Sequence, residues 1–178
     1  MLPNSSNSQS FYLTSPQSSV VVILVHGLTG GPADVRPLAE FLHERGVSVY
    51  GVQLAGHGSD ASDLTKVFYY DWWRSVEEPV QHFIAEQKTI FLVGYAFGGN
   101  LALEMAHKYQ TQVKGVVTVG LAAYLRNDWL IRLTLPWWRK LQSYWPQNWL
   151  RKAMRKEYQP ADLYPVIPLV AVEQLYKF

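Results

Sequence analysis

The sequence predicts an α/β fold, in which a mostly parallel sheet carries helices on both faces. Three features predict it: a continuous run of β-branched and aliphatic residues from Val20 to Val25, strand and helix patterns that alternate as far as Val119, and glycine-rich loops between them. Strands buried on both faces are continuous apolar runs, and alternation with helices is typical of parallel sheets. The 178 residues, 48% of them hydrophobic, can bury a substantial core.

The sequence up to residue 52 predicts two strands, then one helix, then a third strand. Phe11–Thr14 is a short candidate strand, and Val20–Val25 is expected to be a strand buried on both faces of the sheet. A helix is expected over Ala33–Glu44 and a further strand over Val47–Val52. The residues expected on the buried face of that helix are Val35, Leu38, Ala39 and Leu42.

The next part repeats the alternation. A helix is expected over 71–87, capped by its first residue, an aspartate, and Pro79 should kink or break it. Strands over 89–93 and 113–119 should flank a helix over 100–109. The buried stripe of the 71–87 helix should consist of Trp72, Val76, Val80 and Ile84.

From about Leu121 onward the alternating pattern stops. Residues 126–157 contain five of the seven tryptophans, with eight basic residues against two acidic ones. The last segment, 168–178, has a helical pattern, with Leu169, Val172 and Leu175 on one side.

Composition argues against several functional classes. The absence of cysteine excludes disulfides and thiolate metal sites, and no two of the five histidines have metal-ligand spacing, so we expect no metal and no cofactor. A net charge of +2 argues neither for nor against a polyanionic partner. Because the chain shows neither a stronger basic excess nor a recognisable module, we expect no nucleic-acid partner. Residues 1–19 lack lysine and arginine and show no secretory signal, so the expected location is the cytoplasm.

The turn expected between the strand at 89–93 and the following helix carries the chemistry. Its residues are Gly94-Tyr95-Ala96-Phe97-Gly98. A Gly-x-Ser-x-Gly turn in this context is a nucleophile elbow, which lifts its central side chain to the top of the sheet at a helix N-terminus. Here the central residue is alanine, which has no oxygen with which to attack a substrate.

Four motifs occur in the order shown by one known group of enzymes: HGLTGGPADVR at 26–36, GHG at 56–58, DWW at 71–73 and VGYAFGG at 93–99. With them the chain resembles the bacterial carboxylesterase and monoacylglycerol-lipase group of the α/β-hydrolases. The resemblance covers roughly residues 11–120. It implies an α/β-hydrolase fold with a helical cap, and hydrolysis of carboxylic esters by serine acyl transfer without a cofactor.

The resemblance also assigns roles to individual residues. Ala96 takes the position of the nucleophilic serine, and the backbone N–H groups of Leu28 and Phe97 would form the oxyanion hole. The residues expected to shape the site are His26, Gly27, Gly94, Tyr95 and Gly98. The chain then divides into a polar leader over 1–10, the hydrolase core over 11–120, and a helical Trp/Arg-rich cap over 121–178 that ends before the remaining core strands.

The triad implied by the resemblance is incomplete. This fold orders its triad as serine, acid and histidine, but the last histidine here is His107, only eleven positions after Ala96. The chain alone is therefore expected to be inactive. Either a second polypeptide supplies the acid and the histidine, or the sequence is a piece of a longer chain. The expected strand at 113–119 would otherwise leave an unpaired apolar edge.

Several residues have more than one interpretation. Ala96 is either an engineered replacement of serine, which we favour because every flanking residue is kept, or the mark of a natural pseudoenzyme that binds an acyl ligand or regulates a hydrolase. His26 is expected to support the oxyanion loop and His57 to be a packing or hydrogen-bonding residue, and neither is expected to act as a base. Trp72 and Trp73 are expected to pack a helix. The cap is expected to line an acyl pocket, with contact at a membrane surface as a compatible alternative.

Overall fold

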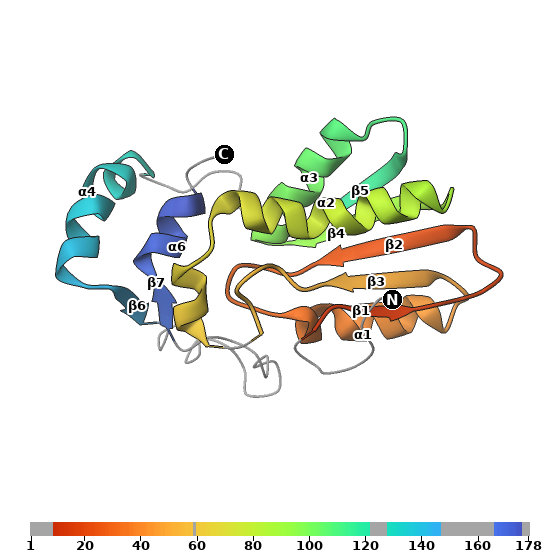
Figure 1. Ribbon diagram of the computed structural model, residues 1–178, viewed down its shortest axis with the longest axis horizontal. Coiled ribbons are helices and arrows are strands. Elements are labelled where there is room, and N and C mark those ends of the chain that lie inside the picture. Colours follow the sequence, from red (N-terminus) through yellow and green to blue (C-terminus); the bar gives the residue numbers. More distant parts are fainter. Residues whose placement is uncertain (1–8, 59, 122–127, 147–165, 176–178) are drawn as a thin grey trace.

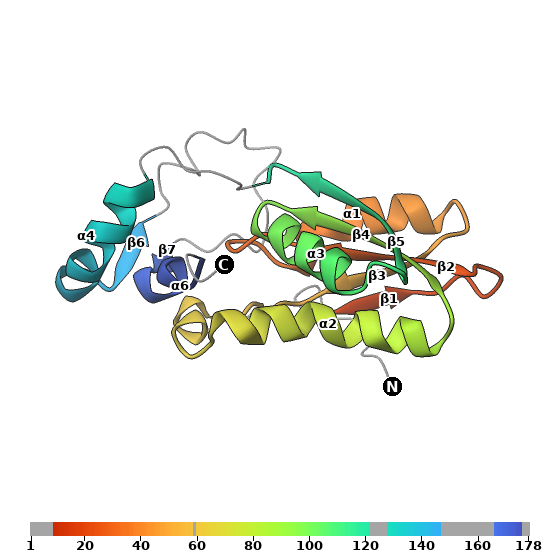
Figure 2. The same ribbon diagram turned by 90° about the horizontal axis from the view of Figure 1, so that it is seen from above.

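The computed structural model describes residues 9–58, 60–121, 128–146 and 166–175. Of the leader expected over 1–10, all but two residues lie outside these ranges. In the views of Figures 1 and 2 the molecule is elongated, with the main sheet and its helices at one end and the C-terminal elements at the other. The fold prediction is confirmed for the part that carries the main sheet.

The main sheet has five strands in the order β1-β3-β2-β4-β5. Strand β1 pairs antiparallel with β3, and the other neighbours pair in parallel. Two predicted strands are confirmed to the residue, and the other boundaries shift by one or two positions. The strands are β1 (Phe11–Leu13), β2 (Val20–Val25), β3 (Ser48–Val52), β4 (Thr89–Tyr95) and β5 (Val113–Val119).

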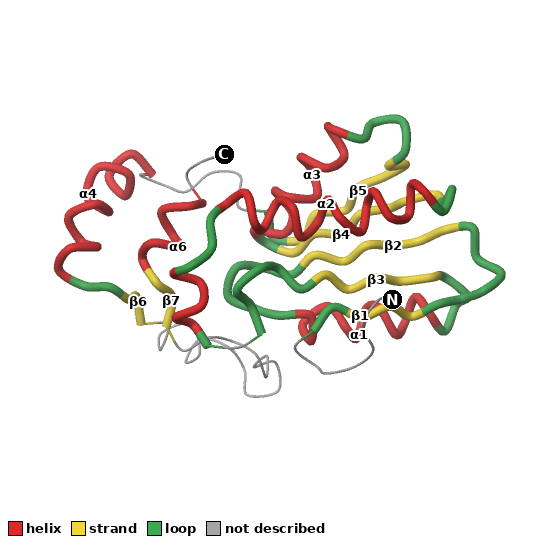
Figure 3. Tube along the Cα trace, in the orientation of Figure 1, coloured by secondary structure: helices red, strands yellow, loops and turns green. Residues whose placement is uncertain are grey.

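Helices cover both faces of this sheet, as Figures 2 and 3 show. The residues of β2 alternate between two apolar clusters: Val21 and Ile23 join the cluster of α2 and α3, whereas Leu24 joins that of α1. Burial on both faces explains why this strand has no polar residue. The helices are α1 (Pro32–His43), α2 (Tyr69–Ala85) and α3 (Phe97–Lys108).

Three predictions about the helices are wrong. Leu38 of α1 is 40% exposed, so it does not belong to the buried face. Asp71 does not cap α2, because the helix begins at Tyr69; instead its carboxylate accepts the N–H of Phe68 at 2.8 Å from within the first turn. Of the kink or break expected at Pro79, the break is wrong, because α2 runs on through this buried residue. Helix α3 also begins three residues earlier than expected.

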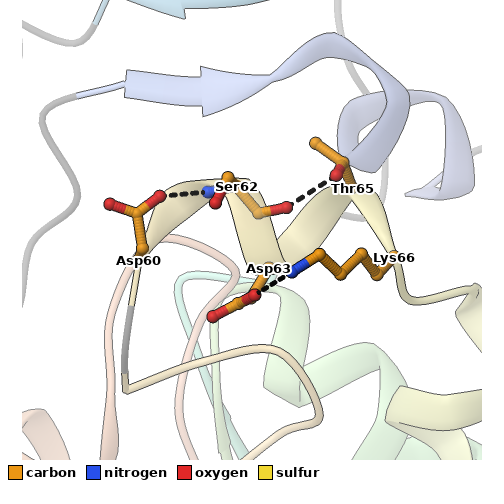
Figure 4. A network of polar contacts seen from close by, with 5 residues as sticks. All are labelled: Asp60, Ser62, Asp63, Thr65 and Lys66. Carbon is orange, nitrogen blue, oxygen red and sulfur yellow. Dashed lines mark hydrogen bonds and ion pairs between the residues drawn. The ribbon is translucent and has the colours of Figure 1, made fainter.

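The loop after β3 ends in a short 3-10 helix, η1 (Ala61–Thr65), held by its own polar side chains (Figure 4). Asp60 accepts the N–H of Ser62 at 2.8 Å, and the Thr65 hydroxyl donates to the Ser62 carbonyl at 2.6 Å. Lys66 pairs with Asp63 at 2.7 Å. These exposed contacts give the loop between β3 and α2 a defined path.

The C-terminal elements form a separate layer at the end of the main sheet (Figure 1). An antiparallel pair of three-residue strands, which the sequence did not predict, lies between two helices. The expected final helix is shorter than 168–178, and residues 176–178 lie outside the described part. The elements are α4 (Asp128–Leu141), β6 (Tyr144–Pro146), β7 (Val166–Pro168) and α6 (Leu169–Gln174).

This layer is joined to the core through β7 and α6. Ile167 and Ala171 belong to the same apolar cluster as the α2 and α3 side chains. Buried Gln174 accepts the N–H of Tyr69 at 3.4 Å, which ties α6 to the start of α2. Within the described ranges, no helix is both long and apolar enough to cross a bilayer.

Candidate active site

The turn between β4 and α3 has the backbone of a nucleophile elbow. Ala96 has φ 49° and ψ −118°, and only one other non-glycine residue of the described part has a positive φ. Such a conformation costs a side-chain-bearing residue about 1–3 kcal/mol. Its N–H donates to the carbonyl of Val119 at 2.8 Å, and its carbonyl accepts the N–H of Gly99 at 2.9 Å. The turn therefore holds a partly exposed methyl group at the N-terminus of α3.

Two glycines allow the turn to close. A Cβ at Gly94 would lie 2.3 Å from the carbonyl oxygen of Gly98, and one at Gly98 would lie 2.4 Å from the carbonyl oxygens of both Val25 and His26. All of these neighbours are backbone atoms, which cannot rotate away. The pattern Gly-x-x-x-Gly is thus a packing requirement, since α3 lies directly against the ends of β4 and β2.

The loop after β2, residues 26–31, lies beside this turn, and we call it the oxyanion loop after the role that the sequence resemblance implies. A Cβ at Gly27 would be 3.4 Å from the Cβ of Ala96 and 3.5 Å from the carbonyl oxygen of Tyr95. Leu28 follows and is buried. Within the described ranges its N–H has no hydrogen-bond acceptor. The amide of Phe97 belongs to the first residue of α3, and N–H groups of a first turn point toward the helix N-terminus.

His26 is completely buried at the base of the oxyanion loop. Its Nε2 accepts the N–H of Leu54 at 3.2 Å, so the ring proton must reside on Nδ1, which donates to the carbonyl of Gly27 at 2.8 Å. Burial, and then the neighbouring His57, lower the pKa of His26 to about 3. Both nitrogens of the neutral ring are therefore engaged with the backbone, and the loop-supporting role expected for His26 stays a prediction.

His57 lies in the second glycine-rich loop, residues 56–58, and its ring contacts the oxyanion loop. Its Nε2 lies 2.7 Å from the carbonyl oxygen of Leu28, and its Nδ1 lies 3.1 Å from that of Ala55. Burial lowers the pKa of His57. A neutral imidazole has one N–H, and we assign it to Nε2, whose contact is the shorter of the two. The rings of His57 and His26 meet edge to face at 4.9 Å.

Trp72 packs against the second glycine-rich loop and the start of α3, contacts that the sequence did not reveal. Its indole N–H donates to the carbonyl of Ala55 at 2.9 Å, and its ring meets that of Phe97 at 5.3 Å. Helix packing was expected, but the bond across 17 positions has no local sequence signal. The same holds for the bond from Leu54 to His26, which spans 28 positions.

The structure therefore brings most of the predicted residues together. His26, Gly27, Gly94, Ala96 and Gly98 surround one another within a few ångströms. The side chain of Tyr95 is about half exposed. No group of three or more metal-ligating side chains is found within the described ranges.

The other three histidines are engaged elsewhere. His43 of α1 lies 3.2 Å from the Ser15 hydroxyl, and His82 of α2 lies 3.2 Å from a carboxylate oxygen of Glu86. His107 is exposed in the last turn of α3, the end opposite Ala96.

A parallel sheet wound with helices, a strained strand-to-helix turn and an adjoining loop of backbone amides define an α/β-hydrolase fold. The profile of Hydrolase_4, described as serine aminopeptidase S33, matches residues 16–165. The chain belongs to this family. The membership agrees with the resemblance seen in the four sequence motifs.

Similar proteins with curated names include two from Bacillus. A thermostable monoacylglycerol lipase of Bacillus sp. strain H-257 is 36% identical over 120 residues, which are 67% of this chain and 47% of the relative. A carboxylesterase of Bacillus subtilis strain 168 is 32% identical over 108 residues, 60% of this chain and 43% of the relative. The chain thus matches just under half of the length of these relatives.

Solved structures of the same fold are more distant in sequence. One from a study of LipS and LipT, two metagenome-derived lipolytic enzymes, has a TM-score of 0.80 at 22% identity and covers 95% of this chain and 66% of that one. The monoacylglycerol lipase of Paleococcus ferrophilus has a TM-score of 0.67 at 15% identity, with 94% and 70% covered. At these identities the likeness establishes the fold alone.

Proposed function

We propose that this chain carries the nucleophile turn and the oxyanion loop of a carboxylic-ester hydrolase that works by serine acyl transfer, with Ala96 at the position of the serine. The observation that carries the proposal is the positive φ of Ala96, at the start of α3 and beside Gly27. Strained backbone of this kind clusters at active sites, which supports a functional role for this partly exposed position.

The chemistry follows from the charges that develop in the reaction. A serine oxygen at position 96 would attack the ester carbonyl, and the carbonyl oxygen would take up the negative charge. The N–H groups of Leu28 and Phe97 would stabilise that oxyanion, each contributing about 100-fold or more to the rate. The ester C–O bond would then break, the alcohol would leave with a proton, and water would release the acid from the acyl-enzyme.

We further propose that a complementary segment supplies the acid and the histidine of the triad. The support is structural: β5 stands at one edge of the five-stranded sheet, with Val117 57% and Val119 46% exposed. Apolar strand edges favour pairing with another strand. Within the described ranges no histidine contacts Ala96, so a base would have to come with that segment.

The substrate proposed is a short- to medium-chain ester or a monoacylglycerol. Similarity to proteins named monoacylglycerol lipase and carboxylesterase supports this class. The segment 121–178 would serve as the cap over the acyl chain, as its aromatic and aliphatic residues suit such a pocket.

An exposed stripe on α4 supports a second role for the cap, contact with an anionic membrane surface. Trp129, Leu133, Trp137 and Leu141 recur every four residues, and each is more than 60% exposed. The surrounding sequence is rich in lysine and arginine, a combination suited to the lipid headgroup region. If replacing both Trp137 and Trp138 with alanine left binding to phosphatidylglycerol vesicles unchanged, this role would be excluded.

The competing proposal is a pseudoenzyme that binds an acyl ligand or regulates a hydrolase, and the methyl group of Ala96 favours it for the chain as written. An Ala96→Cys variant separates the two, because the chain has no other thiol and a thiolate needs no base. The thiolate attacks p-nitrophenyl butanoate, the S–C bond forms, the ester C–O bond breaks and p-nitrophenolate leaves.

We expect one equivalent of p-nitrophenolate and one butanoyl group on the protein by mass spectrometry. The reaction should be about 100-fold faster than in the matched control, Gln110→Cys, whose exposed position lies beyond the other end of α3. The rate of alkylation by iodoacetamide, a reaction that generates no oxyanion, reports how reactive each thiolate is. Dividing each acyl-transfer rate by this alkylation rate corrects for differences in thiolate content between the two variants. Equal corrected rates would contradict the esterase proposal and favour the binding module.

A further inference from the structure

We propose that His26 and His57 are a pair of positioning residues that orient the backbone N–H of Leu28 by binding the peptide groups on either side of it. This inference rests on the proposed function, because an oriented Leu28 amide matters only if an oxyanion meets it. Neither ring is required to touch substrate. The two histidines lie 31 positions apart, in different loops, yet their rings meet at 4.9 Å beneath the oxyanion loop.

His26 controls the peptide group before Leu28. Its Nδ1–H donates to the carbonyl of Gly27 at 2.8 Å, and this carbonyl belongs to the same peptide group as the Leu28 N–H. The structure contains no cis peptide bond in its described part, so the two groups point in opposite directions. Holding the carbonyl toward the buried ring therefore turns the N–H of Leu28 away from it.

His57 controls the peptide group after Leu28. Its Nε2 lies 2.7 Å from the Leu28 carbonyl oxygen and donates to it in the tautomer assigned above. The loop that carries His57 is itself held, because the Gln53 side chain donates to the His57 carbonyl at 2.5 Å and the His57 N–H donates to Leu54 at 3.0 Å. With a bond on each side, both backbone dihedral angles of Leu28 are restrained before any substrate arrives.

The arrangement requires two neutral rings with opposite tautomers. Leu54 supplies an N–H to Nε2 of His26, which leaves the proton on Nδ1, whereas His57 must carry its proton on Nε2. Two cations this close would repel each other in a buried site. The depressed pKa of each ring agrees with a fixed hydrogen-bonding role for the pair, and not with proton transfer.

The first test needs no substitution. Long-range ¹H–¹⁵N spectra of the histidine rings in the unmodified chain report the tautomer of each. We expect the His26 ring to be protonated on Nδ1 only and the His57 ring on Nε2 only, at neutral pH. A cationic ring, or the same tautomer in both, would overturn the proposal whether or not the chain proves to be an esterase.

The second test separates positioning from packing, in the Ala96→Cys background. Glutamine at position 57 keeps an N–H donor, whereas leucine fills a similar volume without one. We expect His57→Leu to slow acyl transfer from p-nitrophenyl butanoate about 10-fold relative to His57→Gln, with iodoacetamide alkylation equal in the two. Equal acyl-transfer rates would overturn the positioning role. If Ala96→Cys itself gave no acceleration over Gln110→Cys, the proposed function would fail, and the ring tautomers would still decide this inference.

Discussion

Replacing Gly98 with alanine tests the close packing that creates the strained turn. The new Cβ would lie 2.4 Å from two carbonyl oxygens at the end of β2 and 2.8 Å from a carbonyl carbon. Overpacking of this kind costs about 1–3 kcal/mol, and rigid backbone neighbours place this site at the upper end. The higher helix propensity of alanine relative to glycine offsets up to about 1 kcal/mol of this destabilisation. We therefore expect the free energy of unfolding to fall by about 2 kcal/mol.

Urea unfolding followed by tryptophan fluorescence measures this change. The matched control is Gly115→Ala in β5, where the new Cβ would meet only the ring of Phe91, at 2.9 Å. That ring is 37% exposed and can turn aside, so the control should stay within about 1 kcal/mol of the parent. A Gly98→Ala chain as stable as the parent, or a control just as damaged, would refute the proposed packing of α3 against β2.

Three further predictions follow from the site. Ala96→Gly should raise the free energy of unfolding by about 1 kcal/mol. Glycine adopts the positive φ without strain, but it also loses more backbone entropy on folding, which cancels part of the stabilisation. Clear destabilisation in urea would contradict the strain at Ala96. The free energy of unfolding should fall as the pH drops below 6.5, by about 2 kcal/mol at pH 5. His26 binds a proton in the unfolded chain at this pH but stays neutral in the native chain, where its pKa is about 3. A free energy of unfolding that does not change between pH 7 and pH 5 would contradict the burial of His26. Trp72→Phe should cost about 1–3 kcal/mol through its lost bond to Ala55, and a change below about 0.5 kcal/mol in the same assay would show that the bond contributes little.

Long apolar runs were the most predictable part of the fold. The strand at 20–25 agrees with the structure to the residue, because a run of valine, isoleucine and leucine has few alternatives in a buried sheet. The strand at 113–119 also agrees to the residue, although it contains lysine, glycine and threonine and is only partly buried. Helix boundaries were less certain. An aspartate serves equally well at a cap and inside the first turn, so Asp71 did not reveal that α2 begins at Tyr69.

The site was predictable where it depends on local backbone geometry. Gly94 and Gly98 identify the turn, because only glycine allows backbone atoms to approach as closely as they do there. The support beneath the oxyanion loop was only partly visible. Both histidines could be placed in loops, but the bonds of His26 to Leu54 and of His57 to Leu28 join distant segments and arise only on folding. The pairing of β6 with β7 was missed because it joins two short strands from separate parts of the chain and arises only on folding.

The most direct test of the account uses the backbone amide spectrum of the Ala96→Cys chain before and after its thiol has been butanoylated. If position 96 stands beside the two oxyanion amides, the thioester carbonyl accepts their N–H groups. The amide protons of Leu28 and Phe97 should then show the largest downfield shifts in the spectrum. If neither moves, and the largest changes lie elsewhere, then the turn does not present residue 96 to an oxyanion hole and the esterase interpretation is wrong.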